Sequence, residues 1–141
     1  MKKAIKEIVV PILNNEYKVV VCFGPSAELE KVLKRRGFPD YARIAPCLDQ
    51  NRGMTFVRDD CHPVIALPQI PKLPDHIGTL AHEAAHAVEH ICSFINAPFT
   101  GELAAHSIGA IVRESLKALK NESTRLNKRS VPKPKNPEHS S

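Results

Sequence analysis

The sequence predicts an α+β fold in which a small, mostly antiparallel sheet packs against a hairpin of two helices. Three runs rich in β-branched or apolar residues, at 17–23, 54–57 and 64–67, stop at glycine, proline or polar turns, as strands do. Two longer segments, 75–96 and 101–120, repeat apolar residues every three or four positions, which indicates amphipathic helices. The chain has 141 residues, 43% hydrophobic and 25% charged. This size and composition suit one hydrophobic core and exclude wholesale disorder.

The first predicted strand, 17–23, leads into a helix. It stops at Gly24-Pro25, where a turn is expected, and Ser26 is placed to cap the helix that follows. The basic run Lys34-Arg35-Arg36 stands just before Gly37 and suits the negative end of the helix dipole. We expect this helix to have a structural role.

The runs 54–57 and 64–67 are separated by a short polar segment, 58–62, and are predicted to pair as a hairpin. Proline cannot donate a hydrogen bond to a neighbouring strand. We therefore expect Val64–Leu67 to lie at an exposed edge of the sheet, because prolines flank and follow it at positions 63, 68, 71 and 74.

The helix expected from Asp75 to about Asn96 separates apolar from polar side chains. One face is apolar and is expected to pack into the domain. The opposite face carries most of the residues capable of chemistry, namely Thr79, His82, Glu83, His86, Glu89, His90 and Ser93.

His82-Glu83-Ala84-Ala85-His86 is an H-E-x-x-H motif inside this helix. Histidines four residues apart lie one turn apart on one face, about 6 Å along the axis, where both imidazoles can bind one metal ion. Glu83 is displaced by about 100° around the helix, so it is not expected to be a ligand but can reach a water held by the metal. His90 is two turns beyond His82, too far to share the ion, and is interpreted as a neighbour or a surface residue.

A catalytic zinc site usually has three protein ligands, so a third is needed. We select Glu102, which opens the next helix and would return beside the histidines in an antiparallel hairpin. His106, one turn later, is either an orienting partner or a replacement ligand. The alternative for Glu102 is a carboxylate that only complements the helix dipole. The oxyanion donor stays open among His62, His90, His106 and Tyr41.

The stretch 79–90 resembles the active-site helix of compact zinc metallopeptidases of the zincin type, particularly the gluzincin-like group that includes ImmA/IrrE-type proteases, and of small phage-encoded proteins of metallopeptidase type. Glu102-Leu103-Ala104-Ala105-His106 is similar to the following-helix segment of that group, although His106 departs from the usual Asn or Tyr. The resemblance implies a zincin-like fold with Zn²⁺ on His82, His86 and Glu102. It also implies that the edge strand Val64–Leu67 lines the cleft and pairs with an extended peptide.

Two functional hypotheses follow. The first is a zinc-dependent metallopeptidase acting on a peptide or protein substrate, in which Glu83 is the general base for a metal-activated water. The second is a non-catalytic, zinc-containing binding or regulatory protein of zincin fold. A thiol nucleophile is not expected, because neighbouring residues such as Cys61 and His62 point to opposite sides of an extended chain.

The remaining sequence features concern location and partners. The four cysteines form no C-x-x-C pair, so we expect reduced, mostly buried thiols. The N-terminus starts like a signal peptide, but charges interrupt it and its apolar run at 8–13 is short and contains Pro11, which predicts a cytoplasmic protein with no membrane association. Residues 120–141 hold six basic and two acidic side chains, so most of the net charge of +5 lies there. We expect one domain at 1–120 and a disordered basic tail at 121–141, with nucleic-acid binding not favoured.

Overall fold

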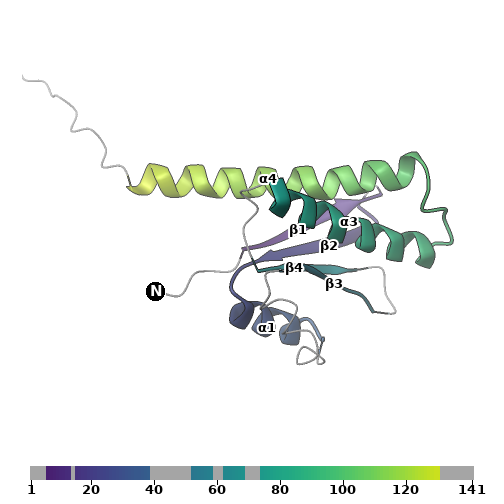
Figure 1. Ribbon diagram of the computed structural model, residues 1–141, viewed down its shortest axis with the longest axis horizontal. Helices are drawn as coiled ribbons and strands as arrows, with labels where there is room; N and C mark the ends of the chain where they lie inside the picture. Colours follow the sequence, from purple (N-terminus) through teal and green to yellow (C-terminus); the bar gives the residue numbers. More distant parts are fainter. Residues whose placement is uncertain (1–5, 14, 39–51, 59–61, 69–73, 131–141) are drawn as a thin grey trace, which may run out of the picture.

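The computed structural model describes residues 6–13, 15–38, 52–58, 62–68 and 74–130, with side chains described up to residue 121. Its centre is a four-stranded mixed sheet in the order β1-β2-β4-β3 (Figure 1). The strands are β1 (Lys6–Ile12), β2 (Tyr17–Phe23), β3 (Met54–Phe56) and β4 (Val64–Leu67). The pairs β1/β2 and β3/β4 are antiparallel, whereas β2 and β4 run parallel.

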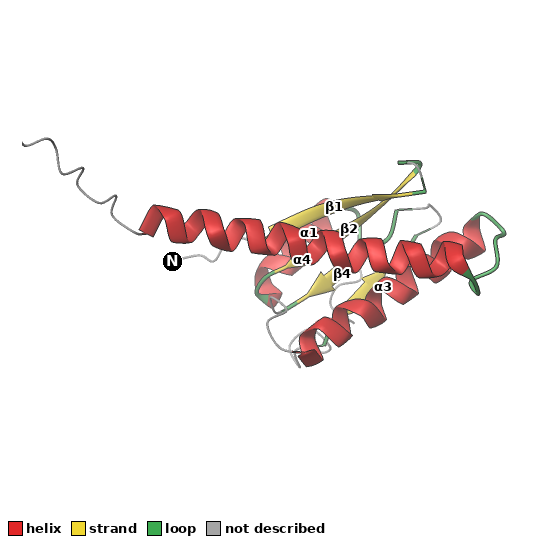
Figure 2. Cartoon of the chain, turned by 90° about the horizontal axis from the view of Figure 1, so that it is seen from above, coloured by secondary structure: helices red, strands yellow, loops and turns green. Residues whose placement is uncertain are grey.

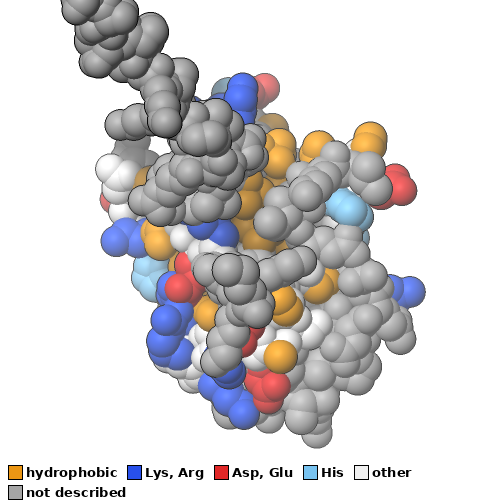
Figure 3. All heavy atoms as spheres, turned by 90° about the vertical axis from the view of Figure 1, so that its left-hand side faces the viewer, with side chains coloured by type: hydrophobic (Ala, Val, Ile, Leu, Met, Phe, Trp, Pro, Cys, Tyr) orange, Lys and Arg blue, Asp and Glu red, His pale blue; other side chains and the backbone are white. Residues whose placement is uncertain are grey.

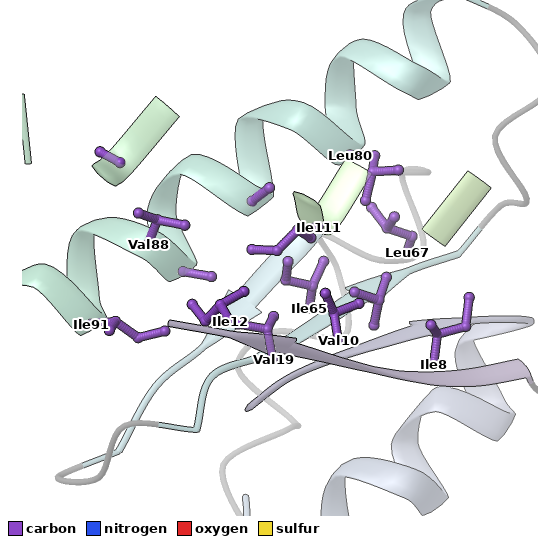
Figure 4. Close-up of a cluster of buried hydrophobic side chains, with 14 of the residues drawn as sticks. Ile8, Val10, Ile12, Val19, Ile65, Leu67, Leu80, Val88, Ile91 and Ile111 are labelled. Atoms are coloured by element: carbon purple, nitrogen blue, oxygen red, sulfur yellow. The ribbon is translucent and has the colours of Figure 1, made fainter. Parts of the chain in front are cut away.

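Helices cover both faces of the sheet. Helix α1 (Ser26–Arg35) lies on one face, and α3 (Pro74–Phe94) and α4 (Glu102–Ser130) lie together on the other (Figures 1 and 2). The α3/α4 side holds the larger core, in which β-branched residues of the strands meet the apolar faces of the two helices (Figure 4). Its labelled members include Val10, Val19, Ile65, Leu80, Val88 and Ile111.

Helix α1 packs its apolar stripe on a smaller second core. Leu29 and Leu33 are fully buried there, against strand residues on that face. Its outer side carries two ion pairs, one between Lys31 and Glu28 and one between Lys34 and Glu30. Basic and acidic side chains lie close together on the lower part of the face in Figure 3, the side on which Figure 1 places α1. Ser26 begins the helix rather than capping it, because Pro25 occupies the N-cap position.

The α+β class, the β3/β4 hairpin and the two-helix hairpin are confirmed. The expectation that Val64–Leu67 forms the exposed edge is wrong, because β4 lies between β2 and β3 and all four of its residues are buried. The prolines at 63 and 68 flank β4 without interrupting it, so its ladder stays intact. A continuous apolar run is typical of a strand covered on both faces.

Among the described strands the outer two are β3 and β1, and β1 is not one of the strands predicted from the sequence. Pro11 lies within β1, opposite Lys18 of β2. An edge strand tolerates proline because its outer side has no neighbour to bond.

Helix α4 is longer than predicted. It runs to Ser130, so residues 121–130 are helical and not a disordered tail, while 131–141 fall outside the described residues. The first proline after the helix start is Pro132, and extending an existing helix gains one hydrogen bond for each residue fixed. Figure 1 shows this end of α4 projecting past the sheet. Within the described part of the chain, no helix is long and apolar enough to cross a membrane.

Candidate metal centre

Helix α3 carries the motif residues and is fixed in place by its apolar face. The residues of this face are buried in the main core, with at most 1% of the surface of each exposed: Leu80, Ala84, Ala87, Val88 and Ile91. Because these residues recur with the helical period, the rotation of α3 on the sheet is set by packing. That rotation leaves His82 and His86 exposed and turns Glu83 toward β3.

The two imidazoles converge. His82 Nε2 and His86 Nε2 are 3.1 Å apart, and the rings stand nearly perpendicular with centroids 4.7 Å apart. Two nitrogens bound to one tetrahedral zinc at about 2.0–2.1 Å would be separated by roughly 3.3 Å. The described side chains therefore fit a single divalent ion, and one donor atom from each of His82, Glu83 and His86 lies within 4.8 Å of the others.

Glu83 differs from its neighbours in being buried, with 6% of its surface exposed. The Thr55 hydroxyl of β3 donates to the Glu83 backbone carbonyl at 3.0 Å and stands 3.4 Å from the Glu83 carboxylate oxygen Oε2. A buried carboxylate without hydrogen bonds would be costly, so this contact stabilises the observed position. Helix α3 and the edge strand thus meet at Glu83.

An open groove of about 470 Å³ runs beside this cluster, between β3 and α3. Its walls are partly apolar, through Met54 and Val57, and partly polar. The remaining lining residues are Thr55, Glu83, His86, Glu89, His90 and Ser93. Of the two interpretations left open for His90, the structure supports the neighbour, because His90 lines the same groove as His86 without being a member of the cluster.

Glu102 is not brought to the imidazoles. It opens α4 as expected, but its side chain is 91% exposed and its Oε2 lies 3.2 Å from His106 Nε2. The only cluster able to hold a metal among the described residues contains His82, Glu83 and His86. The reason is distance along α3, which ends at Phe94, eight residues or about 12 Å past His86, before the chain turns into α4.

Other residues considered from the sequence lie elsewhere. His62 lines a pocket with Arg35, Arg36 and Arg58 and is not part of the groove beside α3. Tyr41 and Cys61 are outside the described residues.

The described cysteines are not candidates for a ligand or nucleophile. Cys22 and Cys92 are free and buried, and burial raises the pKa of the Cys22 thiol to about 12. Burial also raises the pKa of Cys92. Both thiols are therefore protonated near neutral pH, and a thiolate is the form that binds metals and attacks carbonyls.

Sequence reasoning missed Thr55 of β3, which contacts Glu83 from 28 residues away in the chain, and Gly53 just before β3, where an added Cβ would lie 3.1 Å from Glu83 Cγ. Nothing local to these residues signals that contact, because it depends on how β3 crosses α3.

Comparison of the chain with models of protein families, with curated proteins and with solved structures found no match. A functional argument therefore depends on the geometry of the site itself.

Proposed function

We propose that the protein is a zinc-dependent metallopeptidase. The observation that carries the proposal is the 3.1 Å approach of the His82 and His86 Nε2 atoms beside the Glu83 carboxylate. Histidines of an H-E-x-x-H motif bind zinc in this way, and the intervening glutamate serves as a base. The open groove next to the cluster has room for a substrate.

Each residue has a distinct role in this proposal. His82 and His86 would hold the ion, which when bound would supply a Lewis acid able to polarise a carbonyl and acidify water. Glu83 accepts the proton from the attacking water and later gives it to the leaving amine. Its placement at the wall of the groove suits this task, since the carboxylate is within 4.8 Å of both imidazole donors.

The proposed substrate is an extended peptide. The strand that pairs with the peptide in this proposal is β3 and not Val64–Leu67, since β3 is the outermost described strand on that side of the sheet and lines the groove. An edge strand has unpaired backbone groups that can bond to an added strand. Met54 and Val57 give the groove apolar surface for contact with such a peptide.

A second candidate is a non-catalytic zinc-binding or regulatory protein. It is favoured by one observation, the placement of Glu102 beside His106 and outside the cluster. A site with only two histidines and water would bind zinc without the three protein ligands usual in a catalytic centre.

The experiment begins with metal analysis of the purified full chain. We expect one zinc ion per chain, lost in His86→Ala and retained in the exposed control His62→Ala. Hydrolysis of a library of internally quenched peptides is then compared between wild type, Glu83→Gln and the surface control Glu114→Gln. A peptidase loses turnover in Glu83→Gln alone while keeping its zinc. Zinc binding with no hydrolysis in any variant supports the second candidate, and absence of zinc binding overturns both.

A further inference from the structure

We propose that Thr55 is a positioning residue for the Glu83 carboxylate, an inference that rests on the peptidase function proposed above. The Thr55 hydroxyl donates to the Glu83 carbonyl at 3.0 Å and stands 3.4 Å from Glu83 Oε2. A hydroxyl has one proton and can rotate between two nearby acceptors. Thr55 thus ties both the backbone and the side chain of Glu83 to the edge strand.

Gly53 completes this arrangement. Gly53 directly precedes β3, and the direction of its missing side chain is toward α3, as is that of the Thr55 side chain. A Cβ atom at Gly53 would lie 3.1 Å from Glu83 Cγ and 3.0 Å from Thr79 Cγ2. The missing side chain therefore lets β3 approach α3 closely enough for the Thr55 hydroxyl to reach Glu83.

The position of a general base matters because proton transfer requires hydrogen-bond reach of the water. Without the Thr55 hydroxyl, the carboxylate of the buried Glu83 loses a hydrogen-bond donor that fixes its distance from the imidazoles. Small displacements of a catalytic group lower turnover more than they lower substrate binding. We expect Thr55→Val to reduce kcat by about tenfold with KM nearly unchanged.

The variants are chosen to separate the hydroxyl from the shape. Thr55→Val keeps the branched side chain and removes the donor, whereas Thr55→Ser keeps the donor and should restore most of kcat. Thr79→Val is the matched control, because the Thr79 hydroxyl makes a similar bond to the Asp75 carbonyl at 3.0 Å. It should leave kcat unchanged. All variants should keep the zinc content of wild type, since neither imidazole is altered.

A second measurement needs no catalysis. Urea unfolding of the metal-free full chain is compared for wild type, Thr55→Val, Glu83→Ala and the double variant. We expect the two changes to be coupled by at least about threefold in the unfolding equilibrium constant. If the effects of Thr55→Val and Glu83→Ala on the free energy of unfolding are additive, the positioning role is overturned, even if the wild type is an active peptidase. A low kcat in Thr55→Ser overturns it as well. If the two changes are coupled but the protein binds zinc and cleaves no peptide, the contact between Thr55 and Glu83 is supported and only the peptidase function is contradicted.

Discussion

Replacing Gly53 with alanine tests how closely β3 and α3 pack at the site. The added Cβ would lie 2.4 Å from Leu67 Cδ2, 3.0 Å from Thr79 Cγ2 and 3.1 Å from Glu83 Cγ. Leu67 is 3% exposed and Glu83 is 6% exposed, so neither side chain has free space to move into. Overpacking of this kind costs about 1–3 kcal/mol. For a chain of this length the melting temperature should fall by roughly 3–12 °C, measured by circular dichroism.

The backbone itself adds no strain at this position, since positive φ angles among the described glycines occur at Gly37 and Gly101. The loss in Gly53→Ala would therefore report crowding alone. Gly78 and Gly109 provide controls within helices, because a Cβ at either position meets nothing within 4 Å. Alanine there should raise the free energy of unfolding by about 0.5–1 kcal/mol. A Gly53→Ala protein that melts with the wild type or above it would refute the close packing of β3 on α3.

Three further outcomes follow from the structure. Glu102→Gln should leave zinc affinity within twofold in a metal titration, because its carboxylate lies beside His106; a large loss would make Glu102 a ligand after all. Burial raises the pKa of Glu7, but hydrogen bonds from Arg35 and Arg36 outweigh it and leave that pKa below its ordinary value. Ionised Glu7 thus stabilises the fold at pH values above the pKa that Glu7 has in the unfolded chain. Glu7→Gln should therefore lower the free energy of unfolding by about 0.5 kcal/mol at pH 7, and this loss should vanish as the pH falls through the pKa of Glu7 in the folded protein. An equal loss at pH 2.5 would contradict the prediction. The Ser115 hydroxyl is buried with no hydrogen-bond partner among the described residues, so Ser115→Ala should raise unfolding free energy by about 1 kcal/mol in urea titrations, and a loss would show that the hydroxyl is satisfied.

The parts of the site that depend on one helix could be predicted from the sequence. The separation of apolar from polar residues placed a helix at 75–96, close to the observed Pro74–Phe94. Once that helix exists, its 3.6-residue period brings His82 and His86 onto one face. The convergence of their imidazoles is a local consequence of that spacing, so it needed no knowledge of the tertiary structure.

The parts that depend on distant segments could not be predicted. Whether β4 is central or at the edge depends on its parallel pairing with β2, which no turn or loop length encodes. The edge prediction depended on the prolines around β4, whereas its continuous apolar run is typical of a strand covered on both faces. The Glu102 placement failed for a similar reason, since the hairpin prediction was correct but fixed neither the length of α3 beyond His86 nor the rotation of α4.

The contrast in burial between the histidines and Glu83 bears on how the site is assembled. His82 and His86 face solvent, so an ion can reach them without rearrangement of the core. Glu83 is held by the Thr55 hydroxyl of β3, and the absence of a side chain at Gly53 allows the close approach of the two elements. Neither feature involves a metal. The carboxylate is therefore in place before an ion binds, which is the preorganisation that the proposed role of general base requires. If zinc instead drew Glu83 into position, crystal structures of the metal-free and zinc-loaded protein would differ in the Glu83 side chain, whereas this geometry predicts the same rotamer in both.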